Sequence, residues 1–345
     1  MNMTNFACVI AKRIFIFLII SISLLTFVAC STTNSNPKED TTMFQYPSPT
    51  VQNFQTLPQN PIMNGADPFI LLHDGIYYLY STNAKDGYLV YTSTDLKAWE
   101  SKGYCLKKED VKGDKWFWAP EVYFVNEKFY MYYSADEHIC VATSDSPLGP
   151  FVQEEKKPQI VDEKCIDNSL FIDDDGTPYL FFDRFNDGLN IWVAELEDDL
   201  KTVRTSTMTK CINVSQPWEE VMPRVNEGGF VIKRNGLYFM TYSANGYESP
   251  FYGIGVATAT NVYGPWTKYD KNPVYQKVGN LVGIGHSAMF TDKEGKLRIV
   301  FHSHNSKTSV HPRVMHISTV DFKQENGETI MTISPDFHTS IRIFN

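Results

Sequence analysis

Residues 226–245 read NEGGFVIKRNGLYFMTYSAN, and the fold can be worked out from this stretch. Two apolar runs, FVI and LYFM, flank the turn signal Asn235-Gly236, so the stretch predicts a β-hairpin. A glutamate, Glu227, stands where the hairpin begins. A carboxylate is costly to place at the mouth of a buried strand unless the protein uses it. The stretch therefore predicts a strand pair and a candidate reactive group.

The same unit occurs five times along the chain. Each copy has a polar or small first residue, an apolar strand, a turn and a second apolar strand, which is usually aromatic. The copies are DPFILLHDGIYYLYS from Asp67, APEVYFVNEKFYMYYS from Ala119, DNSLFIDDDGTPYLFFD from Asp167, EGGFVIKRNGLYFMTYS from Glu227 and HSAMFTDKEGKLRIVFHS from His286. Their first residues are spaced by 52, 48, 60 and 59 residues.

This spacing predicts an all-β chain folded as a five-bladed β-propeller. A period of about 50 to 60 residues, with three or four short strands in each copy, is typical of a propeller blade. One large antiparallel sandwich is the structural alternative. A sandwich would not produce five similar first residues, so the propeller is favoured.

The N-terminus has the features of an export signal. Lys12 and Arg13 precede an apolar run of 16 residues that ends at Ala29, directly before Cys30. This order predicts a lipoprotein signal peptide over residues 1–29, with Cys30 lipidated after cleavage. A single membrane-spanning helix is the alternative.

The rest of the chain divides into a tether and one domain. We expect a flexible tether over residues 30–58, because the low-complexity run STTNSNPKEDTT follows Cys30 directly. Residues 59–345 are then the propeller, which we expect to be a monomer. The protein would be an exported lipoprotein in the periplasm or on the outer-membrane surface, in contact with a membrane only through Cys30.

Charge and cysteine content exclude several classes of protein. The net charge is −9, which argues against nucleic acid or an anionic membrane surface as the partner. There is no CxxC pair and no metal-ligand spacing among the cysteines. We expect four scattered core thiols in the propeller: Cys105, Cys140, Cys165 and Cys211.

The first residues of the copies form the candidate active site. The innermost strand of each blade runs beside the propeller axis, so Asp67, Asp167, Glu227 and His286 should meet at one end of the channel. Several carboxylates around a small pocket suit cleavage of a glycosidic bond, where one acid donates a proton and another stays ionised. A third acid can raise the pKa of the proton donor by repulsion. The residues alone leave the three roles unassigned.

The motifs at these positions resemble those of glycoside hydrolase family 43. They are Asp67-Pro68, Trp118-Ala119-Pro120-Glu121, Ile166-Asp167 with Asp173-Asp174-Asp175-Gly176, Glu227-Gly228 and Gly285-His286. That family is built on five-bladed propellers and contains arabinofuranosidases, β-xylosidases, arabinanases and galactanases.

The resemblance implies a role for each acid. Asp67 would be the general base, Glu227 the general acid, and Asp167 the residue that tunes the pKa of Glu227 and orients it. The family inverts configuration in one displacement, so a water must fit beside the base. We therefore expect the Asp67 and Glu227 carboxyl groups to lie about 6.5–9.5 Å apart.

The resemblance also implies binding roles. Trp118 and Glu121 would line the sugar site, and Arg313 would lie near the base. His286 would contact a central calcium ion that keeps mostly water ligands, because calcium prefers oxygen.

The expected activity is removal of a pentose from arabinose- or xylose-containing plant polysaccharide. Family frequency puts exo-acting α-L-arabinofuranosidase first and β-xylosidase second, followed by endo-arabinanase or galactanase. The alternative from another class is a glycan-binding propeller without catalysis. Binding alone rarely requires three acids in one pocket, so this alternative is less favoured.

Overall fold

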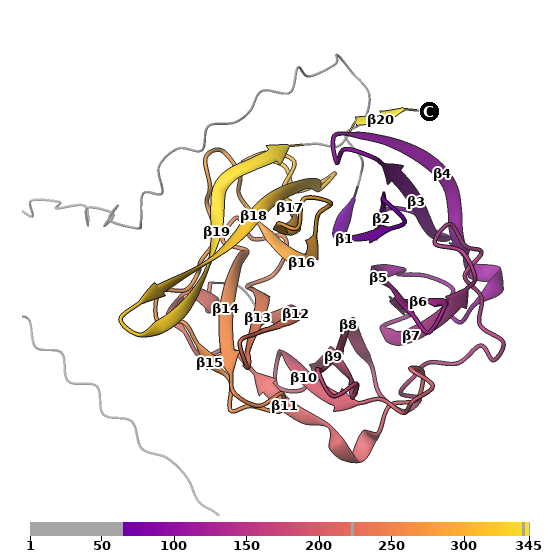
Figure 1. Ribbon diagram of the computed structural model, residues 1–345, viewed down its shortest axis with the longest axis horizontal. Coiled ribbons are helices and arrows are strands. Elements are labelled where there is room, and N and C mark those ends of the chain that lie inside the picture. Colours follow the sequence, from indigo (N-terminus) through magenta and orange to yellow (C-terminus); the bar gives the residue numbers. More distant parts are fainter. Residues whose placement is uncertain (1–64, 222–223, 340–341, 345) are drawn as a thin grey trace, which may run out of the picture. The chain divides into compact units, whose positions relative to one another are not determined.

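The computed structural model describes residues 65–221, 224–339 and 342–344, and its strands form five sheets around a common centre (Figure 1). The first sheet contains β1 (Ala66–His73), β2 (Ile76–Thr82), β3 (Gly87–Ser93), β4 (Ala98–Lys107) and β20 (Arg342–Phe344). The second contains β5 (Trp118–Val125), β6 (Lys128–Ala135) and β7 (His138–Ser144). The third contains β8 (Cys165–Ile172), β9 (Pro178–Phe185), β10 (Leu189–Glu195) and β11 (Thr209–Ile212). The fourth contains β12 (Asn226–Arg234), β13 (Leu237–Ala244), β14 (Gly253–Ala259) and β15 (Thr267–Lys268). The fifth contains β16 (Gly285–Thr291), β17 (Leu297–Ser303), β18 (Val314–Glu325) and β19 (Glu328–Thr339). Three short 3₁₀ helices lie in the connections, at Lys108–Asp110, Thr205–Thr207 and Pro217–Glu219.

The first strand of each sheet lies innermost (Figure 1). Contacts join β1 to β5, β5 to β8, β8 to β12, β12 to β16, and β16 back to β1. This closed ring confirms the predicted five-bladed β-propeller.

Aromatic side chains fill much of the space between blades. The largest fully buried side chains include Trp99, Tyr77, Tyr80, Tyr88, Tyr132 and Tyr242. Rings also join neighbouring blades, as Phe239 of the fourth blade and Phe322 of the fifth do at a centroid distance of 5.1 Å. Large rings bury much apolar area each, so they stabilise the packing of one blade against the next.

Each innermost strand has a β-bulge close to its first residue. The register with the second strand shifts there in all five blades, and one residue at the shift has a positive φ. These residues are Asp67 (52°), Ala119 (46°), Asp167 (56°), Gly228 (60°) and His286 (45°). Left-handed backbone at four non-glycine positions costs free energy and is typical of functional sites. The same left-handed bulge therefore recurs five times around the axis, strained in four blades and relieved by a glycine in the fourth.

A ring of hydrogen bonds between blades holds these bulges. In each case the backbone N–H of the left-handed residue donates to a side chain near the end of the second strand in the preceding blade. The pairs are Ala119 to Thr82 Oγ1 (2.9 Å), Asp167 to Ser134 Oγ (3.0 Å), Gly228 to Asp183 Oδ2 (2.9 Å), His286 to Ser243 Oγ (2.7 Å) and Asp67 to His302 Nδ1 (3.2 Å). The bulge frees each N–H from its own sheet, and the neighbouring blade satisfies it.

The structure corrects one detail of the predicted repeat. Gly228 has the position equivalent to Asp67, Asp167 and His286, whereas Glu227 lies one residue earlier. The sequence alignment placed Glu227 itself at that position because it matched one charged residue to another. A glycine fits the left-handed position at low cost, which leaves the preceding residue free to carry the carboxylate.

The first and last described strands lie in the same blade. β20 pairs in parallel with β4, so the C-terminal strand lies in the sheet that β1 begins (Figure 1). The sequence did not predict this strand. The second blade has three named strands, and an isolated bridge between Thr143 and Val152 stands where other blades have a fourth.

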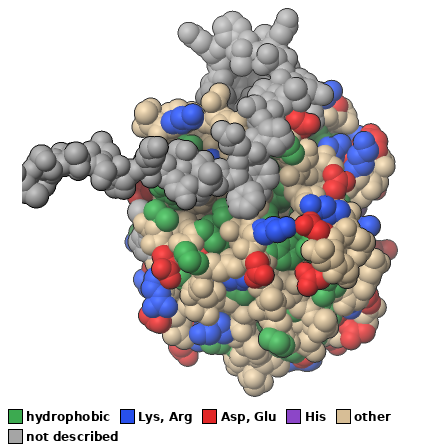
Figure 2. All heavy atoms as spheres, turned by 90° about the vertical axis from the view of Figure 1, so that its left-hand side faces the viewer, with side chains coloured by type: hydrophobic (Ala, Val, Ile, Leu, Met, Phe, Trp, Pro, Cys, Tyr) green, Lys and Arg blue, Asp and Glu red, His purple; other side chains and the backbone are tan. Residues whose placement is uncertain are grey.

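The predicted signal peptide and tether lie outside the residues that the structure describes. Within the described ranges, no helix is long and apolar enough to cross a membrane. The four described cysteines are free thiols, three of them buried and Cys211 half-buried, as expected. On the side of the molecule drawn in Figure 2, acidic and basic side chains are interspersed.

Candidate active site

Asp67 is a buried carboxylate surrounded by polar side chains. Its Oδ1 lies 3.2 Å from Arg313 Nη1, and its Oδ2 accepts a hydrogen bond of 2.7 Å from Thr82. The imidazoles of His286 and His302 each have Nδ1 3.5 Å from Asp67 Oδ1. These groups come from the first and fifth blades, so the propeller itself assembles the surroundings of Asp67.

These neighbours keep Asp67 ionised. Burial alone would raise its pKa, but Arg313, the two histidines and the Thr82 hydroxyl together lower the pKa of Asp67 well below its ordinary value. A carboxylate that remains charged at neutral pH can accept a proton from water.

Glu227 has the opposite electrostatic surroundings. It lies on β12, and its Oε1 accepts a hydrogen bond of 2.6 Å from the hydroxyl of Tyr252. Part of the side chain reaches solvent, but protein atoms surround the carboxyl group. Burial raises the pKa of Glu227 to about 7, with repulsion from Asp67 adding to it and Tyr252 opposing it. Glu227 can therefore hold a proton near neutrality.

Asp167 is coupled to both of the other acids. It is 7% exposed, and burial raises its pKa well above the ordinary value, with the charges of Glu227 and Asp67 adding to the rise. Its Oδ2 is 3.8 Å from His286 Nδ1. The structure thus brings Asp67, Asp167 and Glu227 into one electrostatically coupled cluster, as the sequence predicted.

His286 is the residue expected to contact calcium. Burial lowers the pKa of His286, so its ring is neutral at pH 7, which a metal ligand requires. In the described part of the chain, no group of three or more His, Cys, Asp or Glu side chains is arranged to hold a metal ion. The residues therefore offer no all-protein cage. A calcium ion beside His286 would fit only with water as most of its ligands.

Two of the three predicted binding residues have surroundings that suit their expected roles. Arg313 contacts Asp67 directly. Trp118 is half-buried at the start of β5, and its ring stacks on exposed Trp116 with centroids 5.7 Å apart. Two stacked rings at the start of an innermost strand offer faces suited to sugar C–H groups.

Glu121 is placed differently. It lies two residues beyond Ala119 on β5, where Tyr123 donates a hydrogen bond to its carboxyl group. Burial raises the pKa of Glu121 to about 8, which keeps it neutral at pH 7. Its hydrogen-bonding partners in the described part of the chain do not include the three acids. A substrate-binding role for Glu121 therefore stays a prediction.

Sequence reasoning missed several residues of this cluster. Thr82, Asp183 and His302 lie at or near the ends of second strands, and Tyr252 lies in the loop before β14. His302 stacks on Tyr252 with centroids 5.7 Å apart, which links the surroundings of Asp67 and Glu227. The repeat contained a signal for two of them, Asp183 and His302, because every copy has a polar residue close to its last position.

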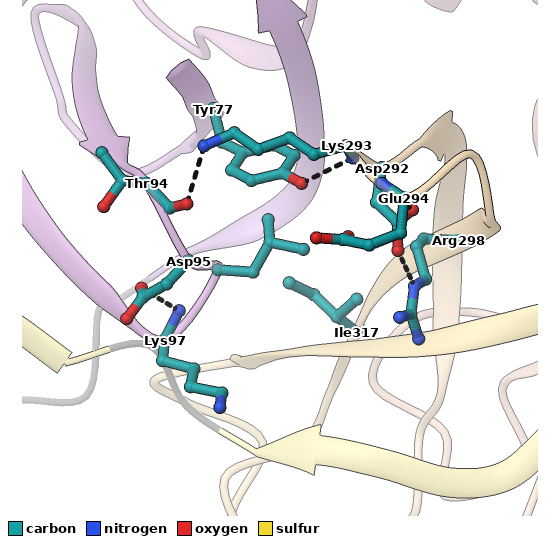
Figure 3. Close-up of a pocket in the computed structure, with 10 residues that line it drawn as sticks. Tyr77, Thr94, Asp95, Lys97, Asp292, Lys293, Glu294, Arg298 and Ile317 are labelled. Atoms are coloured by element: carbon teal, nitrogen blue, oxygen red, sulfur yellow. Dashed lines mark hydrogen bonds and ion pairs between the residues drawn. The ribbon is translucent and has the colours of Figure 1, made fainter. Parts of the chain in front are cut away.

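A separate pocket of about 240 Å³ lies between the first and fifth blades (Figure 3). Most of its lining comes from the turns that follow β3 and β16. Asp67 and His286, at the starts of the innermost strands β1 and β16, are not among its lining residues. Lys293 crosses it, with its backbone N–H donating to Tyr77 and its ammonium to the Thr94 carbonyl. The pocket therefore belongs to the interface between the first and fifth blades and is not part of the acid cluster.

Comparisons with known proteins identify the family of the chain. A family model for glycosyl hydrolases family 43 matches residues 58–327. The solved structure of an endo-1,4-β-xylanase from Bacteroides thetaiotaomicron is 45% identical, with 82% of this chain and 98% of that chain covered and a TM-score of 0.77.

Curated relatives are more distant. A β-D-galactofuranosidase of Aspergillus niger is 25% identical over 70% of this chain and 75% of its own length. An extracellular exo-α-(1→5)-L-arabinofuranosidase of Streptomyces avermitilis is 27% identical over 70% of this chain. The chain covers 55% of that second relative, little more than half its length.

Proposed function

The chain belongs to glycosyl hydrolases family 43, whose members are inverting glycosidases, and we propose that it removes terminal α-L-arabinofuranosyl residues from plant polysaccharide. The family membership gives the reaction class. The sugar and the attack at chain ends are our proposal, supported by the arabinofuranosidase among its relatives.

The reaction requires two carboxyl groups with different protonation states. Asp67, kept ionised by Arg313, takes a proton from a water molecule whose oxygen attacks the anomeric carbon. Glu227 gives its proton to the glycosidic oxygen as the bond between that oxygen and the anomeric carbon breaks. The configuration inverts because water attacks opposite the leaving group. The expected Asp67–Glu227 separation of about 6.5–9.5 Å would leave room for this water.

Asp167 supports the proton donor. The two carboxyl groups repel each other, and the charge of Glu227 raises the pKa of Asp167. In this proposal Asp167 keeps Glu227 protonated at neutral pH and orients it toward the leaving oxygen.

One observation carries the proposal more than any other. Two carboxyl groups in one cluster have pKa values shifted in opposite directions, Asp67 downward and Glu227 upward to about 7. Such a pair distinguishes a proton acceptor from a proton donor. A glycan-binding propeller without catalysis has no need of this separation.

Cleavage of xylan is the second candidate. The xylanase from Bacteroides thetaiotaomicron has 45% identity to this chain, which is higher than that of the arabinofuranosidase above. Both substrates present a pentose to the acids, so the same catalytic arrangement serves either reaction.

Hydrolysis of 4-nitrophenyl glycosides tests the proposal. We expect turnover of the α-L-arabinofuranoside to exceed that of the β-D-xyloside, and release of arabinose from branched arabinan. Asp67→Asn should reduce kcat by about 100-fold or more, because water activation is lost. Preference for xyloside and xylan would support the second candidate, and binding of glycan with no turnover of any substrate would support the non-catalytic one.

The remaining proposals concern location. We propose lipidation at Cys30 and attachment to the periplasmic or outer-membrane surface, on the strength of the signal sequence. Metabolic labelling with a palmitate analogue, lost in Cys30→Ser, would support it. Recovery of unlabelled protein from the soluble fraction would contradict it.

A further inference from the structure

One position in the ring of hydrogen bonds between blades differs chemically from the other four. The ring acceptors are Thr82, Ser134, Asp183, Ser243 and His302. Four of them can satisfy a backbone N–H as neutral groups. Asp183 adds a fourth carboxyl group next to three acids, which raises repulsion unless the group carries a proton.

The two oxygens of Asp183 have different surroundings. The side chain is 0% exposed, and Oδ2 accepts the N–H of Gly228, the residue that follows Glu227. Oδ1 is buried and receives no hydrogen bond from any N–H or O–H group of the described residues. Asp183 lies next to Asp167 in the third blade, because Ile166, the residue before Asp167, pairs with Asp183 across the sheet.

An unsatisfied buried oxygen beside a second carboxyl group indicates a shared proton. The charged and titratable groups that act on Asp183 are Asp167 of β8 and Glu227 of β12, with the thiols of Cys165 and Cys211 nearby. None of these is a cation, whereas the positive charge of Arg313 acts on Asp167 and lowers its pKa. Negative charge is therefore more stable on Asp167, and the proton belongs on Asp183.

We propose that Asp183 is a positioning residue, a neutral carboxylic acid whose Oδ1–H donates to Asp167 while its Oδ2 holds the Gly228 N–H. It joins the third acid to the strand that carries Glu227, and so fixes the distance between them. Burial and the charge of Asp167, which raise the pKa of Asp183 well above its ordinary value, agree with the neutral form. The inference rests on the proposed roles of Asp167 and Glu227.

Two substitutions separate the hydrogen bond from Asp183 to Asp167 from the one that Asp183 accepts from Gly228. Asp183→Asn keeps an oxygen for Gly228 and offers an N–H to Asp167, but cannot ionise. Asp183→Ser places at this position the residue that the second and fourth blades use, Ser134 and Ser243, so it keeps the ring acceptor and removes the group that faces Asp167.

We expect Asp183→Asn to retain kcat within about threefold, because an amide reproduces both hydrogen bonds. Asp183→Ser should lose about 10- to 100-fold in kcat with little change in KM, because Asp167 is no longer held against β12. The melting temperatures of both variants should stay close to that of the wild type. Wild-type kcat in Asp183→Ser would overturn the positioning role, and an equal loss in both variants would overturn the neutral form.

Infrared difference spectroscopy tests the neutral form without any activity. The wild type minus Asp183→Asn spectrum at pH 7 should show the carbonyl band of a protonated carboxylic acid. A carboxylate band in its place would overturn the inference, even if Asp183→Ser fails to fold. Because the spectrum needs no substrate, its result is independent of whether the proposed glycosidase activity is found.

Discussion

At the scale of single residues, the site depends on two carboxyl groups whose surroundings shift their pKa values in opposite directions. Asp67 and Glu227 both carry carboxyl groups that protein atoms enclose. Arg313 lies 3.2 Å from Asp67, whereas the hydrogen-bonding partner of Glu227 is the neutral hydroxyl of Tyr252. The cationic neighbour, rather than burial, therefore decides which acid stays ionised.

The pH dependence of kcat/KM follows from these two groups. Glu227 is active in its protonated form, so kcat/KM should fall as the pH rises through its pKa of about 7. Asp67 is active when ionised, and its lowered pKa puts the acidic limb below the ordinary range for aspartate. Steady-state rates measured across the pH range on 4-nitrophenyl α-L-arabinofuranoside test this prediction.

Glu227→Gln is the control for the assignment. The variant should keep some turnover of this activated substrate, whose leaving group needs little protonation, and should lose the alkaline limb. If the alkaline limb persists in Glu227→Gln, another group is the proton donor.

The sequence predicted the acids and, through the family resemblance, Arg313 beside Asp67, but it missed their other partners. Asp67, Asp167, Glu227 and His286 stood out because they begin copies of the repeat. Asp183 could have been found by aligning the ends of the second strands, where two other blades have a serine. Tyr252 lies in a loop outside the repeat, so no periodic signal marks it.

At the scale of the strand, the bulge at the start of β12 decides where Glu227 lies. Gly228 has φ of 60°, and a Cβ added there would lie 3.2 Å from His286 Nδ1. The residue at this position must therefore be compatible with left-handed backbone and with the imidazole at the same time. The alignment of first residues placed Glu227 rather than Gly228 at this position, because it matched charged residues and took no account of backbone conformation.

Gly228→Ala tests the importance of this bulge. The substitution should lower the free energy of unfolding by about 1 kcal/mol or more, because alanine is strained at positive φ. It should also reduce kcat, because the added methyl group displaces His286 or Glu227. Thermal unfolding and initial rates measure the two effects.

Gly236→Ala is the matched control. Gly236 has φ of 77°, and a Cβ there meets nothing within 4 Å. The Gly236→Ala variant should lose about as much stability as Gly228→Ala but keep the kcat of the wild type. Equal kcat in both variants would show that the position of β12 does not depend on the close approach to His286.

A buried ion pair fixes the first residue of β12. Lys268 Nζ donates to both oxygens of Glu219, at 2.6 and 2.8 Å, and to Asn226 Oδ1 at 2.8 Å. Glu219 is 0% exposed and also accepts a hydrogen bond from Tyr242. Asn226 directly precedes Glu227, so this network anchors the strand that presents the acid.

Lys268→Met should destabilise the fold by about 3–5 kcal/mol, because it leaves the Glu219 carboxylate buried and unpaired. Chemical denaturation monitored by fluorescence measures the loss. Lys271→Met is the comparison, since Lys271 pairs with Glu325 at the surface and its loss should change stability little. Similar stability of the two variants would mean that Glu219 finds another partner or a proton.

At the scale of the molecule, the sequence predicted the number of blades but not the C-terminal strand β20 that pairs with β4 in the first blade. Five copies at regular spacing required five blades, because each hairpin must bury both faces against neighbours. β20 has three residues and pairs with β4, whose residues lie far earlier in the chain. A strand that short, joined by a parallel pairing, has no local pattern that a sequence could show.

The central calcium ion is a prediction at the same scale, because the ion would sit on the axis that all five blades share. If it is present, a chelator should lower kcat and the melting temperature, and calcium should restore both. His286→Ala should reduce the response to the chelator, since the imidazole would be the protein ligand. Identical activity and melting temperature with and without chelator, together with no bound calcium by elemental analysis, would contradict the prediction.

The most direct test of the mechanism is a proton NMR time course of the first sugar anomer released from an α-L-arabinofuranoside. Attack by a water that Asp67 activates, with protonation by Glu227, predicts that β-L-arabinofuranose appears first and then mutarotates. Initial release of the α anomer would mean a covalent intermediate, and would contradict the roles of Asp67 as base and Glu227 as acid.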